Sequence, residues 1–207
     1  KVPISITKTE EPLPHQQSPI SKEEFCKEFI SLSENIFSIS PLRFLLDNKA
    51  KRREKLNLEL MNIAEKLYEG INPEEMPMVG TMELDAEGFE YSAFVPYKST
   101  YLAVESLPMM GSMPHSVVIV KAESEAEAAQ LAKDMEANAN PRKWICVNAR
   151  SVKSASKGQY AILVMTSCEV MPENYDDEAA IEAAEVASAE KSEERANIII
   201  NNFLAAV

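Results

Sequence analysis

The chain has few of the residues that build catalytic or cofactor sites. Only five glycines and two histidines occur among its 207 residues, and the glycines are scattered singly. A phosphate-binding loop needs clustered glycines, because backbone N–H groups must approach the anion closely. A hydrolytic metal site needs several imidazoles or thiolates together, whereas His15 and His115 lie far apart in the sequence. We therefore expect a protein that is not an enzyme and that binds no cofactor.

Cysteine, long apolar runs and positive charge are also scarce. The three cysteines form no CxxC pair, which argues against a zinc knuckle and against a disulfide framework. No apolar run approaches the roughly 20 residues that a membrane-spanning helix needs. The net charge is −12, and an acidic surface repels nucleic-acid phosphates and anionic lipids. We expect no nucleic-acid partner and no transmembrane segment.

The first third of the chain differs from the rest in composition and in the spacing of its apolar residues. Four prolines among residues 1–20 predict an extended, flexible linker. Residues 21–70 predict helices, because a capping-box pattern at Ser21–Glu24 precedes apolar residues at helical spacing. This helical segment either packs beside the remaining domain or forms a separate docking element. Because the chain begins with Lys1 rather than methionine, we expect an upstream segment that was either processed away or lies outside this sequence.

Residues 71–207 predict an α+β domain that ends in an acidic helix. Short apolar runs predict strands over 101–107, 116–121, 144–151 and 159–167, and the last two are joined by a turn at 156–158. Helical patterns cover 123–139, with Ser124 as the N-cap, and 176 to the end. This order predicts a two-layer sandwich, in which an antiparallel sheet of two hairpins carries helices on one face.

Four segments of this domain resemble a known family. They are Pro108–Ser112, Ser116–Lys121, Ser124–Ala139 and Lys157–Val164. Together they are similar to a family of unknown function whose members are exported, often lipid-anchored proteins of Gram-positive bacteria. The resemblance covers roughly residues 56–170. It implies an extracytoplasmic location, at the cell surface or secreted, and it assigns no catalytic residues.

One cluster has the composition of a binding site. Met109, Met110, Met113 and His115 lie within seven residues of one another. Thioether and imidazole groups are the ligands that Cu(I) prefers, so the cluster predicts either a soft-metal site or methionines that fill an irregular gap beneath a loop.

Two cysteines fall on the predicted second hairpin. If that hairpin is centred on Lys157, paired residue numbers add up to 314, and Cys146 then faces Cys168. Opposed strand residues lie close to bridging distance. The pattern predicts either a disulfide between these two residues or two free cysteines that pack as small apolar side chains.

These observations favour a non-enzymatic, extracytoplasmic binding or structural module that is tethered at the cell envelope. Its expected partner is a protein or an envelope component, and the sequence does not specify an oligomeric state. The alternative is a Cu(I)-binding protein that uses the Met109–His115 loop. A third hypothesis is a small hydrolase in which His115 acts as the base, with Ser112 and Ser116 as neighbours. Among the carboxylates, Glu105 is the best placed for a site, at the end of a predicted strand beside the methionine loop.

Overall fold

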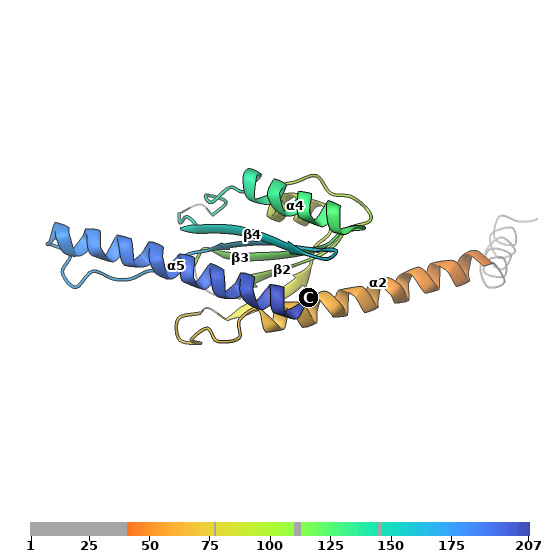
Figure 1. Cartoon of the computed structure of the whole chain (residues 1–207), viewed down its shortest axis with the longest axis horizontal. Coiled ribbons are helices and arrows are strands. Elements are labelled where there is room, and N and C mark those ends of the chain that lie inside the picture. The colour runs from red at the N-terminus through yellow and green to blue at the C-terminus, as the bar shows by residue number, and fades with distance from the viewer. Residues whose placement is uncertain (1–40, 77, 110–112, 145) are drawn as a thin grey trace, which may run out of the picture. The chain divides into compact units, whose positions relative to one another are not determined.

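A five-stranded antiparallel sheet forms the centre of the domain (Figure 1). The structure is a computed structural model that describes residues 41–76, 78–109, 113–144 and 146–207. The strands lie in the order β1-β2-β3-β5-β4. Their bounds are β1 Val79–Glu83, β2 Leu102–Pro108, β3 His115–Lys121, β4 Ser151–Lys157 and β5 Tyr160–Thr166. The predicted α+β class and antiparallel sheet are confirmed.

Four described helices connect or flank these strands. They are α2 Pro41–Lys66, α3 Ala86–Ala93, α4 Glu125–Asn138 and α5 Glu178–Ala206. Within the described ranges, none of them combines the length and the apolarity needed to cross a membrane. The predicted linker over 1–20 and the first predicted helix lie outside the described residues.

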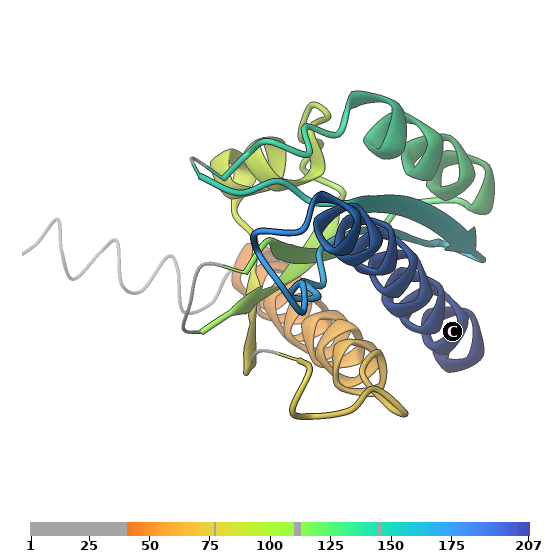
Figure 2. The same cartoon turned by 90° about the vertical axis from the view of Figure 1, so that its left-hand side faces the viewer.

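The sheet is covered on both faces, which corrects the prediction of two layers. One core lies between the sheet and the side that carries α3 and α4, and includes Phe89, Leu131 and Met135. The other joins the opposite face to α2 and α5 through Leu60, Leu67, Ile199 and Phe203, all of which are fully buried. Figure 2 shows α4 and α5 on opposite sides of the sheet. The central strand is apolar on both faces, a pattern typical of a doubly covered sheet.

The second half of α2 belongs to the same compact unit as the sheet. That unit comprises residues 50–207. Leu60, Ile63, Ala64 and Leu67 of α2 contribute to the core that also contains α5. The end of the predicted helical segment therefore shares a core with the sheet.

Local sequence signals account for the element ends. The Ser124 hydroxyl accepts a hydrogen bond from the Glu127 N–H and caps α4 as predicted. Asp177 caps α5 in the same way, through the Ala179 N–H. Gly158 has a φ of +54° in the turn between β4 and β5, a conformation that glycine adopts without strain.

Two strands differ from the prediction. The strand expected over 144–151 lies instead at Ser151–Lys157, because the apolar residues around Trp144 mimic a strand whereas the true strand is small and polar. Strand β1 was not predicted at all. It is five residues long and contains Gly80, so its apolar signal is weak.

Candidate functional site

Two buried polar clusters lie at the start of β3, one on each face of the sheet. His115 and Ser116 are adjacent, so their side chains point to opposite faces. Both residues are almost completely inaccessible to solvent. Buried polar groups persist only where hydrogen bonds satisfy them, and each of these two residues is surrounded by such partners.

The first cluster is a buried ion pair with two hydroxyl groups. The side chains of Lys143 and Glu105 are 5% and 4% exposed, and Lys143 Nζ lies 3.0 Å from Glu105 Oε1. The hydroxyl of Ser92 donates to Glu105 Oε2 at 2.7 Å, and the hydroxyl of Ser116 donates to Glu105 Oε1 at 2.6 Å. Lys143 also donates to Ser116 Oγ at 2.9 Å and lies over the ring of Trp144.

This arrangement places a lysine next to a serine, yet it does not favour nucleophilic catalysis. A serine is activated by a neighbour that can take its proton. Here the Ser116 hydroxyl proton is already directed to Glu105, and the same carboxylate holds the lysine ammonium. The cluster satisfies its own charges and hydrogen bonds, so its geometry is that of a structural lock between β2, β3 and the segment after α4.

The second cluster keeps His115 neutral. Its Nε2 lies 3.0 Å from Tyr68 Oη, and its Nδ1 lies 3.0 Å from Thr166 Oγ1. Burial lowers the pKa of His115 to about 3, and the nearby positive charges of Arg195 and Lys143 act in the same direction. Burial also raises the pKa of Tyr68. A hydrolase that uses His115 as its base would need a carboxylate to orient the ring, whereas its ring partners here are hydroxyls.

Two of the predicted methionine and histidine ligands, Met113 and His115, contact other groups in the described residues. Both nitrogens of His115 are occupied by hydroxyl partners. Met113 Sδ lies 3.5 Å from the Arg195 guanidinium, a position that repels a bound cation. The Met109 side chain is 64% exposed, and Met110 lies outside the described residues. Among those residues, no group of three or more His, Cys, Asp or Glu side chains is placed to hold a metal ion.

The register on which the predicted disulfide depended is wrong. Ser151 pairs with Thr166 and Lys157 pairs with Tyr160, so paired numbers add up to 317 rather than 314. Cys146 precedes β4 and is exposed, whereas Cys168 follows β5 and is buried, and both are free cysteines in the structure. Cys26 lies outside the described residues.

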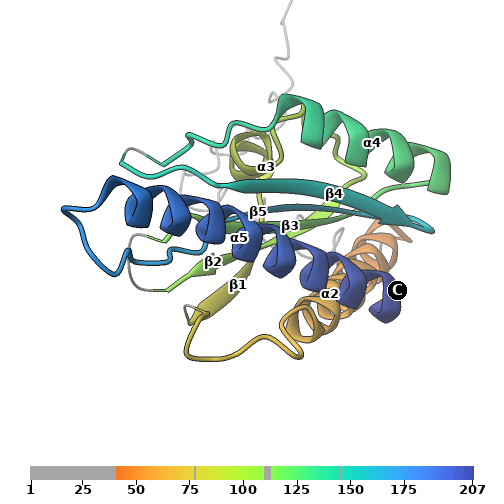
Figure 3. The ribbon, with the colours of Figure 1, turned by 60° about the vertical axis from the view of Figure 1, so that its left-hand side comes forward.

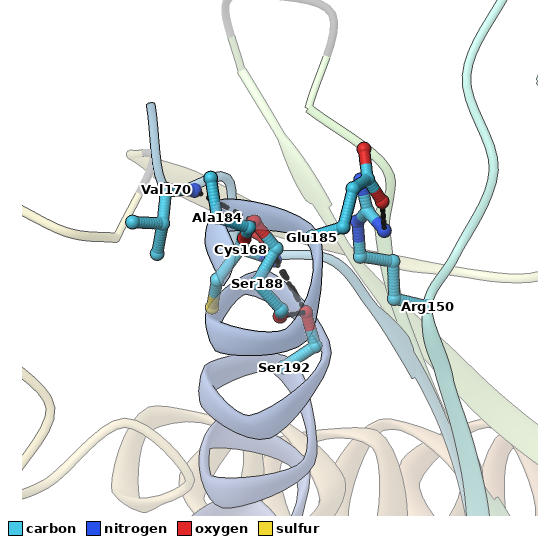
Figure 4. Close-up of polar contacts among 7 residues, drawn as sticks. All are labelled: Arg150, Cys168, Val170, Ala184, Glu185, Ser188 and Ser192. Carbon is cyan, nitrogen blue, oxygen red and sulfur yellow. Dashed lines mark hydrogen bonds and ion pairs between the residues drawn. The ribbon is translucent and has the colours of Figure 1, made fainter. Parts of the chain in front are cut away.

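The chain after β5 is held by serine hydroxyls of α5 rather than by a further strand (Figure 4). The Cys168 N–H donates to Ser192 Oγ at 2.8 Å, and the Val170 N–H donates to Ser188 Oγ at 2.9 Å. Each hydroxyl donates in turn to a carbonyl one helical turn earlier. The small serine side chains let this segment lie close to the helix, and Arg150 of the neighbouring loop pairs with Glu185 of α5.

Among the described residues, no strand pairs with the outer edge of β1, so backbone groups of this strand have no strand partner there. Strand β1 is the last strand on its side of the sheet. Met78 accepts a hydrogen bond from the Met109 N–H, and the Leu84 N–H donates to Ala103, so the even-numbered residues face β2. The N–H and C=O groups of Val79, Thr81 and Glu83 therefore point away from the sheet. Such an edge is a template for pairing with another extended chain.

Apolar side chains flank this edge on both faces. A cavity of about 380 Å³ lies beside the start of β1. Met78, Met82 and Met109 are 73%, 53% and 64% exposed. A side chain at Gly80 would begin 3.1 Å from Met109 Cγ, so glycine lets this methionine lie against the strand. The cavity is lined by Tyr68, Ile71, Pro73, Met76, Met78 and Val79; we call it the methionine groove.

Comparisons with protein-family models, curated proteins and solved structures found no match. The resemblance to an exported family thus stays a prediction. Of the sequence candidates, Glu105 does lie in a buried polar cluster, but its partners Ser92 and Lys143 come from distant segments and no spacing pattern connects them. The β1 edge was missed because an edge strand is defined by its position in the sheet, which the sequence does not encode locally.

Proposed function

We propose that this domain is a non-enzymatic binding module that captures an extended segment of a partner protein along the open edge of β1. The observation that carries the proposal is the coincidence of outward-facing backbone groups with the methionine groove. An added strand would gain hydrogen bonds from Val79, Thr81 and Glu83. Its alternate side chains would meet the groove on one face and Met82 with Met109 on the other.

Methionine suits this purpose for a physical reason. Its side chain is unbranched and its sulfur is polarizable, so a methionine surface can adapt to different apolar side chains. Exposed apolar side chains that gather at one place mark an interaction surface more often than scattered ones do. Three of the exposed large apolar residues, Met78, Met82 and Met109, lie on or beside β1.

The test is selection of a random peptide library on the immobilised chain. We expect peptides with alternating apolar residues that bind the native chain but not Thr81→Pro, because proline removes an outward N–H without removing a bond to β2. Thr81→Val is the matched control: it keeps the N–H and loses only the hydroxyl contact with Ser106. Circular dichroism verifies that both variants fold.

Two results would overturn the proposal. One is a set of selected peptides that bind Thr81→Pro as tightly as the native chain. The other is a native chain that self-associates in sedimentation experiments and becomes monomeric in Thr81→Pro, because β1 would then be an interface between two copies.

We also propose an extracytoplasmic, envelope-tethered location, and only the family resemblance supports it. The test is mass spectrometry of the native protein from separated envelope and cytosol fractions. A lipid-modified amino terminus in the envelope fraction is the expected result. Recovery from the cytosol alone would contradict it.

A further inference from the structure

Three exposed methionines gather on β1 and at the end of β2, the two strands on one side of the sheet (Figure 3). They are Met78, Met82 and Met109, and each is more than half open to solvent. One further described methionine, Met171, is exposed, in the segment after β5. A methionine that fills a gap in a core is buried, so gap filling does not account for the three side chains at β1.

The strand register places these three residues on one face of the sheet. Val79 pairs with Pro108, and the Met109 N–H donates to the Met78 carbonyl at 2.7 Å, so Met78 lies directly opposite Met109. Residues that lie opposite each other in an antiparallel pair have their side chains on the same face. Met82 shares this face, because it is an even number of positions from Met78. Since β1 begins after Met78, this residue also borders the methionine groove.

Gly80 lets the Met109 sulfur lie between the other two methionines. The position that a Cβ atom of Gly80 would take lies 3.1 Å from Met109 Cγ and 3.5 Å from Met109 Sδ. The Met109 side chain therefore crosses onto β1 over Gly80, halfway along the strand between Met78 and Met82. Residues two positions apart in a strand are separated by about 7 Å. Rotation of the exposed side chains of Met78 and Met82 is then enough to bring their sulfurs next to that of Met109.

A group of three thioether sulfurs selects a soft metal. Thioethers are ligands that Cu(I) prefers, whereas Ca²⁺ and Mg²⁺ take oxygen ligands and Zn²⁺ takes thiolate, imidazole or carboxylate. Glu105 lies directly opposite Met82, but its carboxylate is neutralised by Lys143, so this pair adds no net charge beside the sulfurs. The net charge of −12 attracts cations to the chain as a whole.

We propose that Met78, Met82 and Met109 form a binding site for Cu(I). This inference goes beyond the proposed function, because it assigns a second kind of ligand to the β1 side of the sheet. It keeps Met109 from the site that the sequence predicted and replaces the other ligands. His115 is not among them, because its two ring nitrogens contact hydroxyl groups on the opposite face. The metal uses side-chain sulfurs, whereas an added strand uses backbone groups of β1.

The experiment uses Ag(I) as the probe, since it is a soft monovalent ion like Cu(I) and is not readily oxidised. The full chain is labelled with carbon-13 at its methionine methyl groups. Its accessible cysteine thiols are alkylated first, because thiolates bind the same ions. We expect one equivalent of Ag(I) to shift the methyl signals of Met78, Met82 and Met109 in NMR spectra and to leave that of Met171 in place. Zn²⁺ should shift none of them.

Single leucine substitutions assign the signals and test each ligand. Met82→Leu removes one sulfur and nearly preserves the apolar volume, so the fold should persist in circular dichroism. We expect its affinity for Ag(I) to fall at least about 10-fold, since the loss of an outer partner of a metal ligand already costs that much. Met171→Leu is the matched control, because it removes an exposed methionine from another segment, and it should leave the affinity unchanged.

Three results would overturn the metal site. One is an equal loss of affinity in Met82→Leu and Met171→Leu, and another is a set of Ag(I)-induced shifts that spreads over all exposed methionines. The third is the absence of any shift at Met78, Met82 and Met109. None of these results bears on the proposed function, because leucine keeps the apolar surface and the backbone groups that an added strand would contact.

Discussion

The two edges of the sheet are built differently. Side chains of β4 reach the helices on both sides of it: Ser154 donates to Glu136 of α4, and Lys153 pairs with Glu193 of α5. Lys157 donates to the Leu204 carbonyl. Strand β1 instead has exposed methionines and a groove beside it.

This difference matters because an unpaired strand edge invites association. Proteins protect such edges with lysine, short strands or covering elements. Here β4 carries lysines and lies between two helices. Strand β1 is short, and in the described part of the chain Arg53 of α2 pairs with Glu83 at one end of it. An edge left open beside an adaptable apolar groove is consistent with a binding role. Substitutions on the β1 side and on the β4 side should therefore differ in their effects on stability and association.

The largest expected loss of stability follows a substitution on the β1 side of the sheet. Lys143→Met would leave the Glu105 carboxylate buried without its cation, directly opposite Met82 of β1 in the sheet register. We expect a loss of about 3–5 kcal/mol in the free energy of unfolding, measured by urea denaturation. The double variant Lys143→Met with Glu105→Met should recover part of this loss. A single variant as stable as the native chain would contradict the structural lock.

The second-largest expected effect is a loss of stability in acid, caused by His115. The pKa of His115 is lowered to about 3 in the folded chain, while an unfolded histidine titrates near 6.5. The unfolded state therefore binds more protons below pH 6.5, so stability falls as pH falls. Because of His115, we expect the free energy of unfolding to fall by about 2 kcal/mol between pH 7 and pH 5. The loss should be absent in His115→Gln, and hydrogen exchange should locate the early opening near Tyr68.

A smaller effect is expected where α5 holds the chain that follows β5. Ser192→Ala would leave the buried Cys168 N–H without its acceptor, at a cost of about 1–2 kcal/mol. Ser188→Ala should cost less, since Val170 is only half-buried. Thermal or urea unfolding of both variants measures the difference. Equal stability of the native chain and Ser192→Ala would show that water replaces the hydroxyl.

The substitutions with the smallest expected effect on stability test the β4 edge. Replacing Lys153 and Lys157 with threonine should change the free energy of unfolding by less than about 0.5 kcal/mol. It should nevertheless raise self-association, measured by sedimentation velocity, because two protecting charges are lost. Met82→Lys applies the reverse change to β1 and should weaken peptide binding. No change in association would show that the helices alone protect β4.

The sequence predicted those parts of the fold whose signals are local. The hairpin of β2 and β3, helix α4 with its Ser124 cap, and the acidic helix α5 all follow from apolar spacing and capping residues. Strand β4 was misplaced because its small polar residues resemble a loop. The one-sided helix layer was wrong, although the continuous apolar runs in β3 and β5 are typical of a sheet that is covered on both faces.

The candidate site depended on information that is not local. Lys143 meets Glu105 across 38 residues, and Tyr68 meets His115 across 47. Sequence reasoning selected Glu105 and His115 because they are unusual residues near a strand end. It interpreted His115 as a catalytic base or a metal ligand. Its burial and its two hydroxyl partners instead indicate a neutral histidine with a structural role.

The adjacent polar residues at the start of β3 have a consequence for how the strands find their alignment. Residues 117–120 are Val, Val, Ile and Val, so a slip of one position would exchange nearly equivalent side chains between the two faces. Most of the strand therefore specifies its pairing only weakly. A slip would carry His115 toward Glu105 and Lys143 and Ser116 toward Tyr68 and Thr166, which breaks both networks at once. These two residues mark the correct register, and misaligned chains should accumulate during refolding when either is replaced by valine.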